Sequence, residues 1–205
     1  MRHYRRNIIW GSGNMKQPIF FTSLCFVLAT SCSTILVNTT NKDGIQENPA
    51  RRTAGAVIED RSIETIVAVN LKADNQAFRE ARFNVVSHNG VVLLVGQIQN
   101  QSLKQKATEI IAKASSKIKR IHNELEISEK RGILSRGNDS WIATKVRTLI
   151  LANDEVPSNQ VKVTVENGVV YLMGILTESE GDKAANVARN VVGVKKVIKV
   201  FEYVT

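Results

Sequence analysis

Side chains that could carry out catalysis are few in this sequence, and their spacing does not build an active site. The chain of 205 residues has three histidines and two cysteines. His88 stands beside an expected turn and His122 on an expected strand, with no cysteine or carboxylate cluster at a matching spacing. Metal-ligand spacings, phosphate-binding loops and nucleophile motifs are also missing from the sequence. We therefore expect a protein without enzymatic activity, metal, cofactor or small-molecule substrate.

Cys32 is placed for a covalent modification instead. From Met15, one lysine is followed by an apolar run over residues 19–29, and small residues then lead to Cys32. This is the pattern of a secretory signal, and the run is too short for a comfortable transmembrane helix. Residues 28–31 resemble the lipobox of bacterial lipoproteins, in which the cysteine becomes the first mature residue and carries acyl groups such as palmitate. An ordinary cleaved signal peptide with an incidental cysteine is the alternative.

The remaining cysteine usage favours lipidation of Cys32. Cys25 would leave with the signal, so Cys32 would be the single thiol of the mature chain and no intramolecular disulfide could form. We expect residues 1–31 to be a signal peptide that starts at Met1 or, as we prefer, at Met15. Arg5 and Arg6 leave a twin-arginine signal as the alternative. Ser33, where an aspartate would favour the inner membrane, indicates the outer membrane and a periplasm-facing protein.

The net charge is modest once the expected signal is removed. Four of the 28 basic residues and none of the 19 acidic ones lie in residues 1–31, so the net charge falls from +9 to +5. Mild basicity suits an anionic membrane surface. It is weak support for nucleic acid, which a secreted protein seldom meets. We therefore expect no nucleic-acid partner.

A duplicated pattern organises the rest of the chain. Residues 84–98 and 162–176 align without a gap, so that Asn89-Gly90 falls on Asn167-Gly168. Each copy reads as an apolar strand, an Asn-Gly turn with positive φ at both positions, and a second strand. Such a duplication predicts two domains of one kind. Domains of roughly 65 to 70 residues bury too little surface to enclose a large pocket.

Both copies are expected to have an α+β fold in the order helix, strand, strand, helix, strand. A three-stranded mixed sheet packed against two helices buries this set of elements compactly. The elements expected in the first domain are a helix over 62–73, strands over 82–87, 91–97 and 120–127, and a helix over 101–115. Those expected in the second are a helix over 141–152 capped by Asp139 or Ser140, a hairpin over 161–176, a helix ending at Val192 and a strand over 195–204.

The expected boundaries follow from these elements. Residues 32–60 are expected to be a lipidated N-terminus and a flexible tether, because they hold Asn, Thr, Gly and Pro with little periodicity. The first domain is expected over 61–128, the linker over 129–139 and the second domain over 140–204.

Two such domains behind a lipoprotein signal resemble the DolP (YraP) family of outer-membrane lipoproteins with two BON domains. The residues that carry the resemblance are NGVVLLVGQ (89–97), ENGVVYLMG (166–174), NDSWIATKVR (138–147) and GVKKVIKVF (193–201). The resemblance implies the αββαβ fold and attachment to the inner face of the outer membrane. It also implies binding of anionic phospholipid such as phosphatidylglycerol, and a part in envelope integrity and at sites of cell division.

In that family the first helix of the second domain makes the main lipid contact, which here is WIATKVRTLILA (141–152). Ile142, Val146, Leu149 and Ile150 follow helical spacing and are expected to be the core stripe. Trp141, Lys145, Thr148 and Leu151 form a neighbouring stripe with the apolar groups and cations that a membrane interface needs. The residues expected at the lipid are Trp141, Lys145, Val146, Arg147, Thr148 and Leu151.

Three other interpretations remain open on the sequence. Trp141 could pack against its own domain or across a domain interface. The chain could be a protein-binding adaptor of the outer-membrane assembly machinery, because small sheets accept partner strands and an exposed tryptophan suits a protein interface. It could also be a structural spacer, which would leave the basic, aromatic helix unexplained.

Overall fold

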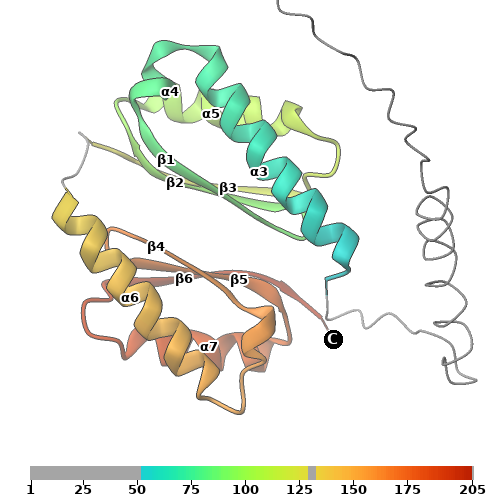
Figure 1. Cartoon of the computed structure of the whole chain (residues 1–205), viewed down its shortest axis with the longest axis vertical. Coiled ribbons are helices and arrows are strands. Elements are labelled where there is room, and N and C mark those ends of the chain that lie inside the picture. The colour runs from blue at the N-terminus through green and yellow to red at the C-terminus, as the bar shows by residue number, and fades with distance from the viewer. Residues whose placement is uncertain (1–51, 129–132, 205) are drawn as a thin grey trace, which may run out of the picture. The chain divides into compact units, whose positions relative to one another are not determined.

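A computed structural model describes residues 52–128 and 133–204, which form two units of the same topology (Figure 1). Cys32 and the expected signal lie outside these residues. The first unit comprises α3 (Ala54–Asp74), α4 (Gln76–Glu80), β1 (Arg82–His88), β2 (Val91–Ile98), α5 (Gln101–Ala114) and β3 (Arg120–Ile127). The second comprises α6 (Ile133–Leu151), the 3-10 helix η1 (Ser158–Gln160), β4 (Lys162–Glu166), β5 (Val169–Leu176), α7 (Glu178–Arg189) and β6 (Lys196–Tyr203).

Each unit has one three-stranded mixed sheet, as expected. The strand orders are β1-β2-β3 and β4-β5-β6. In both sheets the first two strands pair antiparallel as a hairpin, and the last strand runs parallel to the middle one. The long helices of each unit lie on one face of its own sheet (Figure 1).

The Asn-Gly turns confirm the hairpin prediction. Asn89 and Gly90 have φ values of 52° and 79°, and Asn167 and Gly168 have 54° and 75°. Positive φ at both central positions gives a turn whose twist matches that of the flanking strands, and asparagine and glycine accept this conformation at little cost.

The helix starts differ from the sequence prediction. Helix α3 begins at Ala54, where the Thr53 hydroxyl accepts a hydrogen bond from the Ala56 N–H at 3.1 Å, so residues 54–60 are helical and do not belong to a tether. Helix α6 begins at Ile133, eight residues before Trp141, so Asp139 and Ser140 lie inside the helix and neither is its cap. The carboxylate of Asp139 is buried and bonds elsewhere in the domain.

A short helix, α4, was not expected. The Asn75 side chain accepts a hydrogen bond from the Phe78 N–H at 3.3 Å and begins this helix directly after α3 ends. Phe78 is fully buried in the first core. The turn of helix thus serves to bring one large aromatic side chain under the sheet.

Every unit has its own hydrophobic core between sheet and helices. The first core includes Ile63, Val67 and Leu71 of α3 against Val92 and Leu94 of β2. The second is built in the same way from α6, β5 and α7. The buried residues of these two cores lie between positions 63 and 201.

The outer faces of the two sheets also share a core. Val86, Leu93 and Val95 of the first sheet pack with Tyr171 and Met173 of the second, and the cluster is completed by Val91 and Val200. Strands β2 and β5 are therefore buried on both faces. The two domains dock through this cluster.

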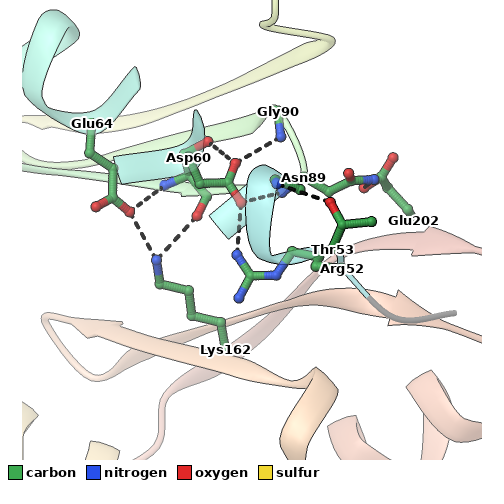
Figure 2. A network of polar contacts seen from close by, with 10 residues as sticks. Arg52, Thr53, Asp60, Glu64, Asn89, Gly90, Lys162 and Glu202 are labelled. Atoms are coloured by element: carbon green, nitrogen blue, oxygen red, sulfur yellow. Dashed lines mark hydrogen bonds and ion pairs between the residues drawn. The ribbon is translucent and has the colours of Figure 1, made fainter. Parts of the chain in front are cut away.

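Polar contacts around this shared core are reciprocal. The Asn89 side chain donates to Glu202 of β6 at 2.8 Å, and the corresponding Asn167 donates to Glu126 of β3 at 3.2 Å. Lys162 of β4 also reaches the first domain, where its ammonium donates to Glu64 at 2.9 Å and to the Ser87 carbonyl at 3.1 Å (Figure 2). Each Asn-Gly turn thus binds its own domain and the opposite one.

Candidate membrane-contact site

The orientation of α6 is set first by its apolar stripe. Ile142, Val146 and Ile150 are buried in the second core, and Leu149 packs partly against it, as predicted. Residues three and four positions apart lie on the same side of a helix. The stripe therefore turns the face that carries Trp141, Lys145 and Leu151 away from the core.

A buried carboxylate fixes the same helix at a second point. Asp139 accepts hydrogen bonds from the Asn167 N–H at 2.9 Å and the Gly168 N–H at 2.8 Å. In the first domain Asp60 of α3 binds the Asn89 and Gly90 N–H groups in the same way (Figure 2). These hydrogen bonds hold the first helix of each domain against the hairpin turn of that domain. The exposed face of α6 therefore has a fixed orientation in the second domain.

The exposed face of α6 carries large apolar side chains beside a cation. Trp141 is 52% exposed and Leu151 is 72% exposed, although both are residues that normally lose solvent contact in a folded domain. Lys145 and Thr148 are exposed between them, and the Thr148 hydroxyl donates to the Thr144 carbonyl at 3.0 Å. Trp141 thus does not pack into its own core or into the shared core between the sheets.

Two of the predicted lipid contacts are placed differently. Val146 is fully buried in the second core, so the prediction that it meets lipid is wrong. Arg147 is exposed, but its guanidinium donates to the Val163 carbonyl of β4 at 2.7 Å. The Arg147 side chain therefore contacts the edge strand β4. Lys145 is the cation that lies on the same exposed face as Trp141.

Sequence reasoning missed one residue of this region. Val192, in the turn after α7, is 79% exposed and is the most exposed large apolar side chain in the described part of the chain. The only signal for it was a valine next to Gly193, where the helix was expected to stop. A single apolar residue in a turn carries no periodicity.

Two of the histidines, His88 and His122, lie on strands β1 and β3 of the first sheet. Burial, together with the positive charge of Arg52, lowers the pKa of His88 to about 4. Burial also lowers the pKa of His122. Both rings are therefore neutral at pH 7. Residues 52–128 and 133–204 contain no group of three or more His, Cys, Asp or Glu side chains that could hold a metal ion.

None of the helices in these two ranges is long and apolar enough to cross a membrane.

Known proteins resemble this chain over most of its length. Residues 59–129 and 138–205 each match the BON domain. The 21 kDa hemolysin of Actinobacillus pleuropneumoniae is 46% identical over 153 residues, which are 75% of this chain and 78% of that protein. The outer membrane lipoprotein DolP of Haemophilus influenzae is 41% identical over 152 residues, 74% of this chain and 78% of that protein. The osmotically-inducible protein Y of Escherichia coli K12 is 26% identical over 163 residues, 78% of this chain and 80% of that protein. The chain therefore belongs to the BON-domain family and, within it, to the DolP group with two such domains in tandem.

Proposed function

We propose that this chain is a non-enzymatic, periplasm-facing lipoprotein of the outer membrane that binds anionic phospholipid through α6 of its second BON domain. The observation that carries the proposal is the exposure of Trp141 and Leu151 beside Lys145, on the side of α6 opposite its buried stripe. The outer membrane lipoprotein DolP of Haemophilus influenzae, a relative of this chain, supports the location.

The chemistry of the exposed face suits the boundary between headgroups and acyl chains. An indole ring prefers this boundary because its body is apolar and its N–H is polar. A lysine near an anionic surface contributes about 1 kcal/mol, so α6 alone would bind weakly. A lipid anchor at Cys32 would hold the domain close to the membrane. The resulting high effective lipid concentration would keep α6 bound for much of the time despite its weak affinity.

Replacing Trp141 with alanine tests the lipid contact. Trp10 and Trp141 are the two tryptophans of the sequence, so the segment 33–205 contains Trp141 alone. We expect this segment to cosediment with vesicles that contain phosphatidylglycerol but not with purely zwitterionic ones, and to dissociate at high salt. Trp141→Ala should weaken binding by about tenfold, because the largest apolar contact is lost.

Val69→Ala is the matched control, because Val69 is an exposed apolar residue of α3 in the first domain. Its binding should equal that of the parent. Binding by Trp141→Ala that matches the parent would refute the role of Trp141. If the parent binds neither kind of vesicle, a pulldown from outer membranes that survives detergent would favour the alternative, an adaptor of the assembly machinery.

Lipidation of Cys32 is tested separately. In cells, Cys32→Ala should abolish incorporation of labelled palmitate and move the protein from the outer-membrane fraction to the soluble periplasm. Cys25→Ala changes the other cysteine of the chain and should do neither. A Cys32→Ala protein that stays with the membrane fraction would contradict anchoring at this residue.

The same proposal assigns the protein a part in envelope integrity, including at division sites. A domain that is anchored in the inner leaflet and reads anionic lipid would concentrate where such lipid is enriched. Cells that carry only Cys32→Ala or Trp141→Ala should then resemble cells without the protein in their sensitivity to detergents. Equal resistance of these cells and the parent would argue against this part.

A further inference from the structure

We infer that the turn between α7 and β6 is a second membrane-insertion point of the second domain, with Val192 as the inserted side chain. This inference rests on the proposed lipid binding by α6 and adds to it a residue outside that helix. The turn comprises residues 190–195, from the last residue after α7 to the residue before β6. Its partner would be the same anionic phospholipid surface.

The duplication inside the chain gives the first argument. In the first domain Lys119 donates its N–H to the Gly90 carbonyl at 2.9 Å, and in the second Lys195 donates to the Gly168 carbonyl at 2.8 Å. The Lys117 carbonyl lies against Gly90 as the Gly193 carbonyl lies against Gly168. Lys117 and Gly193 are therefore equivalent, and the residue before each, Ser116 or Val192, occupies the same place.

Trp141 has an equivalent in the first domain as well. Asp60 and Asp139 brace the two Asn-Gly turns identically, so the residues two positions later, Ser62 and Trp141, correspond. At both positions the first domain has an exposed serine, and the second has a large apolar side chain that remains exposed. Solvent-exposed tryptophan and valine at these two positions distinguish the second domain.

The two positions are also neighbours in space. Gly193 packs against α6 so closely that an added Cβ would lie 3.1 Å from Ile142 Cδ1 and 3.9 Å from Asn138 Oδ1. Val192 precedes Gly193, and Trp141 precedes Ile142. Each of the two exposed residues is therefore the chain neighbour of a residue in this contact, at the same end of the domain.

Charge around the turn suits an anionic surface. Residues 183–200 contain five basic side chains and no acidic one. Arg189 and Lys196 flank the turn, Lys195 lies within it, and all three are exposed. The Lys195 ammonium also donates to the Asn167 side chain at 3.1 Å. The turn of the first domain is basic too, with Lys117, Lys119 and Arg120, so the apolar residue is the feature that sets the two turns apart.

A contact beyond the helix axis has a mechanical consequence. Trp141 and Leu151 lie ten residues apart on one helix, about 15 Å along its axis. Two contacts on one line would let the domain roll about that line on the membrane. A third contact at Val192, on a different segment, removes this freedom and gives the domain one orientation at the surface.

Single-tryptophan variants test insertion directly. In the segment 33–205, the double variant Trp141→Phe and Val192→Trp places the only indole at the turn. With vesicles of phosphatidylcholine and phosphatidylglycerol, its emission should shift to the blue and be quenched by brominated acyl chains. The control, Trp141→Phe with Ser116→Trp, carries its indole at the equivalent turn of the first domain and should show neither change.

Affinity gives an independent measurement. Val192→Ser restores the residue of the first domain and should weaken vesicle binding by about fivefold, since a valine side chain no longer leaves water. Ser116→Val should leave binding unchanged. Because Val192 is exposed, neither change should disturb the fold.

The outcomes separate this inference from the proposed function. If Trp141 of the parent is quenched while Trp at position 192 keeps a water-like emission, the turn stays out of the membrane and the inference fails, although lipid binding by α6 stands. If the parent does not bind these vesicles, both fail. Quenching at 192, together with weaker binding by Val192→Ser, would establish the second insertion point.

Discussion

Asp60→Ala should lower the free energy of unfolding by about 3 kcal/mol or more at pH 7, because several buried hydrogen-bond donors would lose their common acceptor. The Asp60 carboxylate accepts from the Asn89 N–H at 2.8 Å, the Gly90 N–H at 2.9 Å and the Ser87 hydroxyl at 2.7 Å (Figure 2). It also pairs with Arg52 at 2.7 Å. Urea unfolding followed by circular dichroism measures the loss.

Two further variants bracket this effect. Among the residues whose side chains the structure describes, Asp139 accepts from two backbone N–H groups, whereas Asp60 also accepts from a hydroxyl and a guanidinium, so Asp139→Ala should cost less than Asp60→Ala. Asp74→Ala removes an ion pair with the half-exposed Lys106 at 3.3 Å and an exposed hydrogen bond from the Asn75 side chain at 3.1 Å, and should cost about 1 kcal/mol or less. Equal stability of Asp60→Ala and Asp74→Ala would show that the turn does not depend on its carboxylate.

Acid provides a second signature of Asp60. Burial by itself would raise the pKa of this carboxyl, but hydrogen bonds from Gly90, Ser87, Asn89 and Arg52 together hold the pKa below its ordinary value of 3.8. The folded state therefore binds this proton less readily than the unfolded state does. The stability that Asp60 contributes is present above pH 4 and is lost as the pH falls through the lower folded pKa.

Short-range sequence patterns were sufficient to predict the strands and the hairpin turns. The Asn-Gly pairs specify their hairpins through φ alone, and apolar runs on both sides supply the strands. The start of α6 could not be found in this way. Asp139 looks like a helix cap in the sequence, but its partners, Asn167 and Gly168, lie 28 and 29 residues further along the chain. Only the tertiary structure shows that its carboxylate is already engaged.

Docking of the two sheets did leave a trace in the sequence. Residues 91–95 (VVLLV) and 169–173 (VVYLM) are continuously apolar, whereas a strand with one face in water alternates between apolar and polar residues. In the structure Leu93 and Val95 face the other sheet, while Val92 and Leu94 face their own helices. A continuous apolar run in a three-stranded sheet thus predicts a cover on the second face, although it does not say what that cover is.

For the candidate site, helical periodicity correctly predicted which face of α6 is buried, but it could not predict which residues outside α6 lie near the exposed face. The i, i+4, i+7, i+8 stripe identified Ile142, Val146 and Ile150 as core, and therefore Trp141 and Leu151 as the outer face. Val192 reaches the same region through a turn that follows α7, and no pattern within α6 could indicate it. Comparison of the two domains with each other makes Val192 visible, because its equivalent is a serine.

Because of His88, the free energy of unfolding should decrease as the pH is lowered from 7 to 5. This histidine is buried at the end of β1, and burial lowers its pKa to about 4 with further help from Arg52 and Lys162, while Asp60 opposes the shift. Its ordinary value in an unfolded chain is 6.5. The unfolded state therefore takes up the proton first as the pH falls, and the folded state loses stability until the pH reaches the folded pKa.

The size of this loss follows from the two pKa values. Between pH 7 and pH 5 it amounts to about 2 kcal/mol, and it approaches about 3 kcal/mol near pH 4. Urea unfolding at a series of pH values measures it. His88→Gln, which keeps a neutral polar side chain, should flatten the curve across this range. His122→Gln is the control, because this ring is only partly buried and should account for a smaller part of the slope.

The pH at which stability is lost distinguishes His88 from the carboxylates around it. Asp60 acts below pH 4, so a fall that begins near pH 6.5 and disappears in His88→Gln can come only from the histidine. Protonation of His88 would place a third positive charge near those of Arg52 and Lys162. Lys162 belongs to the opposite domain. The contact between the domains should therefore weaken first in acid, and a His88→Gln protein that loses stability as steeply as the parent would contradict this assignment.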